Sequence, residues 1–137
     1  MIQEAIMQQE NLFPYFNTIK KLLNDFKNSL IELQNNEHEN SPLNLCYIAF
    51  DEINSLSQLF EHYSVIEFTE SIKVKIKQLH ENNITITEEL YSILHDCHDY
   101  VFKIILLLEN EKQISMTDEM RDIKNILLKK FNFYIIE

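Results

Sequence analysis

Apolar residues recur at three- and four-residue spacing along most of the chain, a pattern typical of amphipathic helices. The first long helix is expected to start near Pro14, because proline is favoured at the first helical position. It is expected to end in the polar run 34–40. A weakly amphipathic opening segment, Ile2–Gln9, either stands apart or extends this helix. The inward face of the long helix is predicted to comprise Phe16, Ile19, Leu23, Phe26, Leu30 and Leu33.

Start and stop signals define two further helices. Ser41 and Pro42 form a cap and first turn for a second helix. A third helix is predicted over Tyr63–His80 and is interrupted by Asn82 and Asn83. The second helix is expected to bury Leu45, Ala49, Ile53, Leu56 and Phe60. The third is expected to bury Val65, Phe68, Ile72, Ile76 and Leu79.

The last third of the chain predicts two more helices. Thr85 or Thr87 caps the fourth helix, and Thr85 with Glu88 fits a capping box. The fifth starts at Ser115 or Thr117, and the apolar tail 133–136 either docks on the bundle or meets a partner. The inward residues of the fourth helix are predicted to be Leu90, Ile93, Leu94, Cys97, Val101, Ile104 and Leu108. Those of the fifth are predicted to be Met120, Ile123, Leu127 and Phe131.

Composition narrows the fold class. The 137 residues include two prolines and no glycine, so a fold rich in tight β-turns is disfavoured. Short connections between long amphipathic helices favour antiparallel packing. We therefore expect one all-α domain over residues 1–137, an antiparallel four-helix bundle with an additional C-terminal helix.

Net charge bears on the class of partner. The formal charge of −10 argues against nucleic acid and anionic membranes, which are bound through Lys and Arg, and permits a basic protein partner.

The absence of glycine excludes a glycine-rich phosphate loop, and no cofactor is expected. Cys46 and Cys97 fall in apolar patterns and are interpreted as reduced core residues. The segment 1–9 lacks the pattern of a signal peptide, and the run 104–108 is too short to cross a bilayer, so a cytoplasmic location is expected.

The second helix contains the sequence C-Y-I-A-F-D-E-I-N-S-L-S-Q-L-F. It resembles the central helix of histidine phosphotransfer domains, whose pattern is roughly F-x-x-A-H-x-[LI]-K-G. Tyr47 stands near the aromatic position and Ile53 two residues past the histidine, while Asp51 replaces the histidine itself. Asn54 and Ser55 replace the lysine and glycine. A shift of one residue would instead place Glu52 at the histidine position, and neither acid can perform imidazole phosphorylation.

The resemblance extends from about residue 13 to 108 and is strongest to the N-terminal domain of CheA-type chemotaxis kinases. The segment K-L-L-N-D-F-K-N-S-L-I-E-L-Q looks like the family's first helix, and I-T-I-T-E-E-L-Y-S-I-L looks like the entry to its fourth. The segment I-K-V-K-I sits where the family has L-E-x-x-L, and a fifth helix is also a trait of that subgroup. The resemblance implies a phosphotransfer-type bundle that has lost its chemistry, and its implied partners are a receiver domain or a histidine kinase.

The candidate binding site is a polar stripe on the second helix. Asp51, Asn54, Ser55 and Gln58 stand at i, i+3, i+4 and i+7, so they share one helical face. Opposite the expected core residues, this stripe is predicted to be exposed. The resemblance implies that it is the face on which a receiver docks, with the charge of Asp51 partly imitating a phosphorylated histidine. The other interpretation is an ordinary solvated helix face.

The sequence leaves a metal site, a phosphorylation site and an inhibitor function as further possibilities. His95 and Asp99 have the spacing of a helical zinc chelate, but Cys97 points inward, which favours an exposed ladder of His95, Asp99 and Lys103 over a metal site. His62, in the turn before the third helix, is either a displaced phosphorylation site or a turn residue. The surplus of 22 acidic over 12 basic residues also fits an immunity or antitoxin-type inhibitor that binds a basic toxin.

Overall fold

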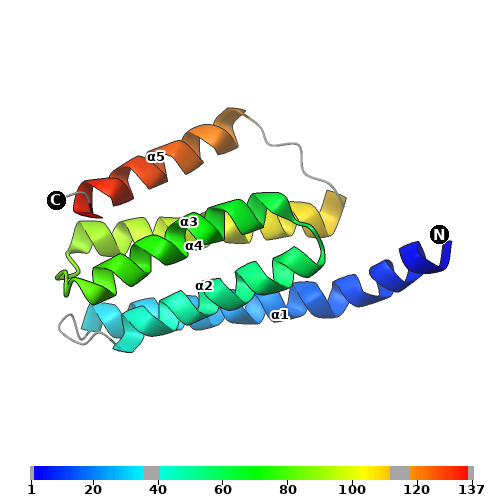
Figure 1. Cartoon of the computed structure of the whole chain (residues 1–137), viewed down its shortest axis with the longest axis horizontal. Helices are drawn as coiled ribbons and strands as arrows, with labels where there is room; N and C mark the ends of the chain where they lie inside the picture. The colour runs from blue at the N-terminus through cyan, green and yellow to red at the C-terminus, as the bar shows by residue number, and fades with distance from the viewer. Residues whose placement is uncertain (1, 36–40, 112–117, 136–137) are drawn as a thin grey trace.

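Five α-helices make up the computed structural model, which describes residues 2–35, 41–111 and 118–135. Their side chains are described over residues 12–35, 42–110 and 118–134. The helices are α1 (Ile2–Asn35), α2 (Ser41–Leu59), α3 (Tyr63–Glu81), α4 (Glu88–Glu111) and α5 (Asp118–Ile135). The all-α bundle with antiparallel neighbours that the sequence predicts is confirmed (Figure 1).

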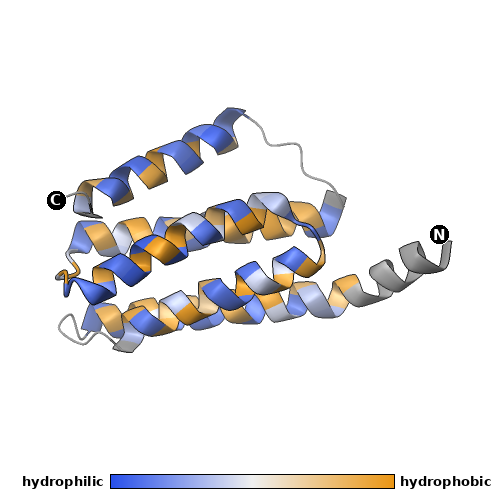
Figure 2. Cartoon of the chain, in the orientation of Figure 1, coloured by the Kyte–Doolittle hydropathy of each residue, from blue (hydrophilic) through white to orange (hydrophobic). Residues whose placement is uncertain are grey.

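Four helices form the body of the bundle and the fifth covers one side. α1 contacts α2 and α4, while α3 contacts α2 and α4, which closes a ring of four. α5 lies over α3 and α4, and the first turns of α1 extend past the other helices (Figure 1). Each helix carries hydrophobic and hydrophilic residues along its described length (Figure 2), and the buried ones join in one core.

α2 and α3 are each followed by a residue in the left-handed conformation, a position that glycine usually occupies after a helix. Glu61 and Asn83 have φ of 57° and 51°, in the left-handed region. After α3, the amide of Ile84 donates to the Leu79 carbonyl (3.1 Å) and that of Asn83 to the His80 carbonyl (3.3 Å). These two bonds form a Schellman motif. The α2 end repeats it, and Asn82 and Asn83 end α3 as the sequence predicts.

The predicted start of the first helix is wrong, whereas one of the two predicted caps of α4 is confirmed. The expectation that the first long helix starts near Pro14 is wrong, because α1 begins at Ile2 and Pro14 lies inside it. Proline has a helical φ, and although it removes one donor and crowds the carbonyl four residues earlier, α1 continues through it. Thr87 is the α4 cap, since its Oγ1 accepts from the Leu90 amide at 3.2 Å. Ser115 and Thr117 lie outside the described residues.

The inward face of α2 is rotated from the prediction. Leu45, expected in the core, is 47% exposed, whereas Cys46 and Phe50 are fully buried. Phe50 stacks on Phe26 of α1, with ring centroids 4.3 Å apart. Beyond Pro42 in the first turn, the buried residues of α2 are Leu43, Cys46, Ala49, Phe50, Ile53, Asn54 and Ser57, so the predicted inward positions of Ala49 and Ile53 are confirmed. The helix is held between α1 and α3, so its buried sector is wider than a single apolar stripe and includes the polar edge that faces α3.

Both cysteines are free and buried, as predicted. Burial raises the pKa of the Cys46 thiol to about 12, and it also raises the pKa of the Cys97 thiol. Neither side chain is therefore a thiolate nucleophile near neutral pH. Among the described residues, no helix is both long enough and apolar enough to cross a membrane.

Candidate protein-binding face

Asn54 belongs to the interior of the bundle. Its side chain is 2% exposed, so the expectation that it shares an exposed stripe with Asp51, Ser55 and Gln58 is wrong. Asn54 Nδ2 donates to the Ile66 carbonyl oxygen (3.0 Å) and to Thr69 Oγ1 (3.1 Å) of α3. Gln58 Nε2 donates to Asn54 Oδ1 at 2.7 Å. The amide therefore joins α2 to α3 through a buried hydrogen-bonded network.

Asp51 is half-exposed and is tied to α3. Its Oδ1 accepts from Lys73 Nζ at 2.8 Å, and Lys73 also pairs with Glu70 at 3.0 Å. The hydrogen bond to Asp51 is the main reason why the pKa of Lys73 is raised. The lysine is largely buried, so it offsets much of the local charge of Asp51. Asp51 is thus part of an interhelical ion pair.

The exposed face of α2 lies beside the predicted stripe rather than on it. Leu45 and Ile48 are 47% and 41% exposed, and Leu59 at the end of the helix is 76% exposed. Glu52 and Ser55 lie between them and are exposed as well. We call this set, Leu45, Ile48, Glu52, Ser55 and Leu59, the α2 outer face. Of the four predicted site residues, only Ser55 belongs to it, while Gln58 is exposed at its edge toward α3.

A groove of about 320 Å³ runs between the α2 outer face and α1. Contacts of Tyr15 with Ser57, and of Phe26 with Cys46, show that the two helices run antiparallel. The groove is lined by Leu22, Asp25, Asn28, Ser29, Leu45, Ile48, Ala49 and Glu52. Leucine, isoleucine and alanine supply its apolar surface, and the exposed Asp25 and Glu52 supply carboxylates. No lysine or arginine is among its lining residues.

The sequence pattern contained a signal for this face that the prediction missed. Leu43, Cys46, Phe50 and Ile53 also follow three- and four-residue spacing, so two overlapping apolar faces compete along α2. Choosing the face with Cys46 and Phe50 would have left Leu45 and Ile48 outside. The large aromatic side chain is the better core indicator because it buries more apolar area.

His62, which the sequence left open as a displaced phosphorylation site or a turn residue, lies in the turn that precedes α3. Its Nδ1 lies 2.9 Å from the Tyr15 hydroxyl, which lies 3.1 Å from Ser57 Oγ. The rings of Phe16 and Phe60 stack beside it. Burial lowers the pKa of His62 and raises that of Tyr15, so the network favours a neutral imidazole that accepts from the tyrosine.

The depressed pKa of His62 predicts a pH effect on stability. The unfolded chain takes up a proton at this histidine at a higher pH than the folded one, so the free energy of unfolding falls as the pH drops below about 6.5. We expect His62→Asn, which retains a polar side chain but does not titrate, to lose less stability than the wild type between about pH 8 and pH 5.5. Urea denaturation across this range measures the difference. Parallel profiles for the two proteins would contradict the assignment.

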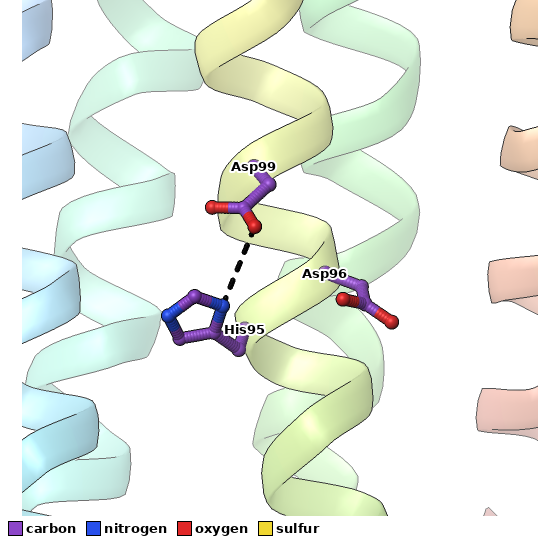
Figure 3. Close-up of side chains that lie close together, drawn as sticks. All are labelled: His95, Asp96 and Asp99. Carbon is purple, nitrogen blue, oxygen red and sulfur yellow. Dashed lines mark ion pairs between the residues drawn. The ribbon is translucent and has the colours of Figure 1, made fainter.

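Within the described ranges, a cluster of potential metal ligands lies on α4. Ligand atoms of His95, Asp96 and Asp99 lie within 4.8 Å of one another. His95 Nδ1 is 3.4 Å from Asp99 Oδ2, and His98 Nδ1 is 3.0 Å from Asp99 Oδ1. Figure 3 shows His95 and Asp96 projecting to opposite sides of one turn, with Asp99 above them. The predicted pairing of His95 with Asp99 is confirmed, and Asp99 is shared by two histidines.

The described part of the chain is an all-helical domain of five helices. No protein-family model matches it, and no match was found among curated proteins or among solved structures.

Proposed function

We propose that this chain is a non-catalytic, phosphotransfer-like bundle that binds a signalling protein through the α2 outer face. The observation that carries the proposal is the exposure of Leu45, Ile48 and Leu59 on one helix whose polar Asn54 is buried. Exposed apolar residues that line a groove, with polar residues beside them, are typical of a protein-binding surface. The surface has the composition expected of a docking site.

The sequence resemblance supports a receiver domain or a histidine kinase as the partner. An aspartate at the histidine position supports binding without phosphotransfer. Because Lys73 already pairs with Asp51, we assign Asp51 to the contact between α2 and α3 rather than to imitation of a phosphorylated histidine. Contact with the partner is assigned to Ser55 and its apolar neighbours.

Affinity capture of the tagged chain from its source cells, read by mass spectrometry, tests the proposal. We expect the wild type to recover a receiver domain or a histidine kinase. Ser55→Arg is expected to reduce recovery at least tenfold, because an arginine would stand in the centre of the contact; such a loss is about 1.4 kcal/mol or more. Ser92→Arg, the same change at an exposed position of α4, is the matched control and should recover the partner normally.

Recovery of the same signalling partner by Ser55→Arg would remove the α2 outer face from the proposal. Both variants change an exposed serine, so their thermal unfolding should match that of the wild type. That measurement separates a lost contact from a lost fold.

A second candidate function, an acidic inhibitor of a basic toxin, is favoured by an uneven distribution of charge. α4 carries Lys103 as its one basic residue, whereas α5 carries Arg121, Lys124, Lys129 and Lys130. The acidic residues of α4 are Glu88, Glu89, Asp96, Asp99, Glu109 and Glu111. An inhibitor would use such a concentration of acidic residues on one helix to attract a basic protein. In that case the captured protein is a small basic toxin, and Ser92→Arg weakens its recovery more than Ser55→Arg does.

A further inference from the structure

The groove between α1 and α2 combines an apolar surface with two exposed carboxylates. Leu22 of α1 and Leu45, Ile48 and Ala49 of α2 supply the apolar side chains. Asp25 and Glu52 are exposed, and neither has an ion-pair partner within the described part of the chain. The lining of the groove itself contains no lysine or arginine.

We propose that this groove binds an amphipathic helix whose apolar stripe is flanked by lysine or arginine. The inference rests on the proposed function and names the chemistry of the partner segment. A helix laid in a groove inserts residues at i, i+3 or i+4, and i+7. The apolar side chains of such a helix cover Leu22, Leu45 and Ile48. Its basic side chains reach the two carboxylates at the groove.

The length of the groove fits a short helical segment. Its lining residues on α1 run from Leu22 to Ser29, and those on α2 run from Leu45 to Glu52. Each stretch is two helical turns, or roughly 10 Å along the axis. Two turns of a partner helix present three successive anchor positions, which is enough to fill the apolar part of the groove.

Charge argues against a second copy of this chain as the occupant. Two copies that met through this groove in a two-fold arrangement would bring the same residues together. Asp25 and Glu52 of each copy would then approach the carboxylates of the other, with no lysine or arginine in the linings to pair with them. Like charges placed together in an interface cost binding free energy. A basic segment turns the same carboxylates into attractive contacts.

Two synthetic peptides of about 16 residues test the occupant directly, each roughly 24 Å long when helical. Both carry leucine at i, i+3, i+4 and i+7, and the leucine stripe is flanked by lysine in one and by glutamate in the other. Fluorescence anisotropy titration of the full chain should show the lysine peptide binding at least tenfold more tightly. Added salt should weaken that binding, since the carboxylates are exposed.

Substitutions in the groove lining test which residues bind the peptide. The double variant Asp25→Lys with Glu52→Lys should reverse the preference in favour of the glutamate peptide. Ile48→Glu should reduce binding of the lysine peptide at least tenfold. The matched controls are Glu119→Lys on α5, an exposed acid elsewhere, and Val74→Glu on α3, which changes an apolar residue of 47% exposure. Both controls should bind the lysine peptide nearly as well as the wild type does.

The outcomes separate this inference from the proposed function. Equal affinity for the two peptides, or equal losses in Glu119→Lys and in the groove variants, would overturn the basic-helix assignment and leave only general attraction to an acidic protein. If the peptides fail to bind while a captured signalling partner still depends on Ser55, the outer face of α2 stands and the groove occupant is wrong. If both tests fail, neither proposal survives.

Discussion

Phe26→Ala is expected to lower the free energy of unfolding by about 3–5 kcal/mol, the usual cost of emptying a buried phenylalanine site. Phe26 is fully buried and lies where three helices meet. Its ring stacks on Phe50 of α2 at 4.3 Å and on His98 of α4 at 6.1 Å. Its carbonyl oxygen lies 3.8 Å from Cys46 Sγ. The substitution leaves a cavity at the centre of the α1–α2–α4 contact, and chemical denaturation measures the loss.

Phe13→Ala is the matched control for this prediction. Phe13 lies on the same helix but is 71% exposed, so the same change should alter stability by no more than about 0.5 kcal/mol. Because a domain of this kind has a total stability of about 5–15 kcal/mol, the Phe26 variant could be substantially unfolded at elevated temperature. Similar losses for the two variants would show that the contact of α1 with α2 and α4 is not built around Phe26.

Asn54→Ala is expected to destabilise the fold by about 1–3 kcal/mol. The change removes the bonds to the Ile66 carbonyl and Thr69 Oγ1, and it leaves Gln58 without its acceptor. Thr69 Oγ1 still donates to the Val65 carbonyl at 2.7 Å but loses its own donor. The loss in the free energy of unfolding comes from the buried polar groups that are left without a hydrogen-bond partner. Equilibrium unfolding in urea measures it.

Asn24→Ala provides the comparison for Asn54. Asn24 is exposed in the middle of α1, where alanine is the better helix former, so its replacement should stabilise the protein by a few tenths of a kcal/mol. Opposite signs for the two variants would establish Asn54 as a structural residue. A stability of Asn54→Ala equal to that of the wild type would indicate that the α2–α3 contact does not depend on its amide, and the residue would become available again for a binding role.

Apolar spacing predicted α3 and α4 most accurately. Every residue expected on the inward face of α3, from Val65 to Leu79, is buried, and the same holds for α4 from Leu90 to Leu108. In these helices the predicted apolar stripe lies at the centre of the buried face, although α4, which contacts α1, α3 and α5, also buries His98, Tyr100 and Ile105. The polar pair Asn82 and Asn83 also ends α3 as expected, because asparagine tolerates the left-handed conformation.

On α2 the start at Ser41 and the burial of Ala49 and Ile53 are confirmed, but the predicted exposed stripe is wrong because the polar residues are divided between two environments. Asp51, Asn54 and Gln58 contact α3 or each other, and Leu45 and Ile48 remain exposed. An isolated sequence shows that a residue is polar, but it does not show whether a neighbouring helix offers a hydrogen-bond partner. The groove is lined by residues of α1 and α2 that are separated by the connection between the two helices, so no local pattern could reveal it.

The sequence by itself determined that this protein is helical, because helical spacing and the lack of glycine are local properties of the chain. It also determined the order of the helices and most of their buried residues. Only the tertiary structure decided which edge of α2 meets α3, that Asp51 pairs with Lys73, and that leucine and isoleucine remain outside beside two carboxylates. These features depend on how helices distant in sequence rotate against one another, and packing of the whole core sets that rotation.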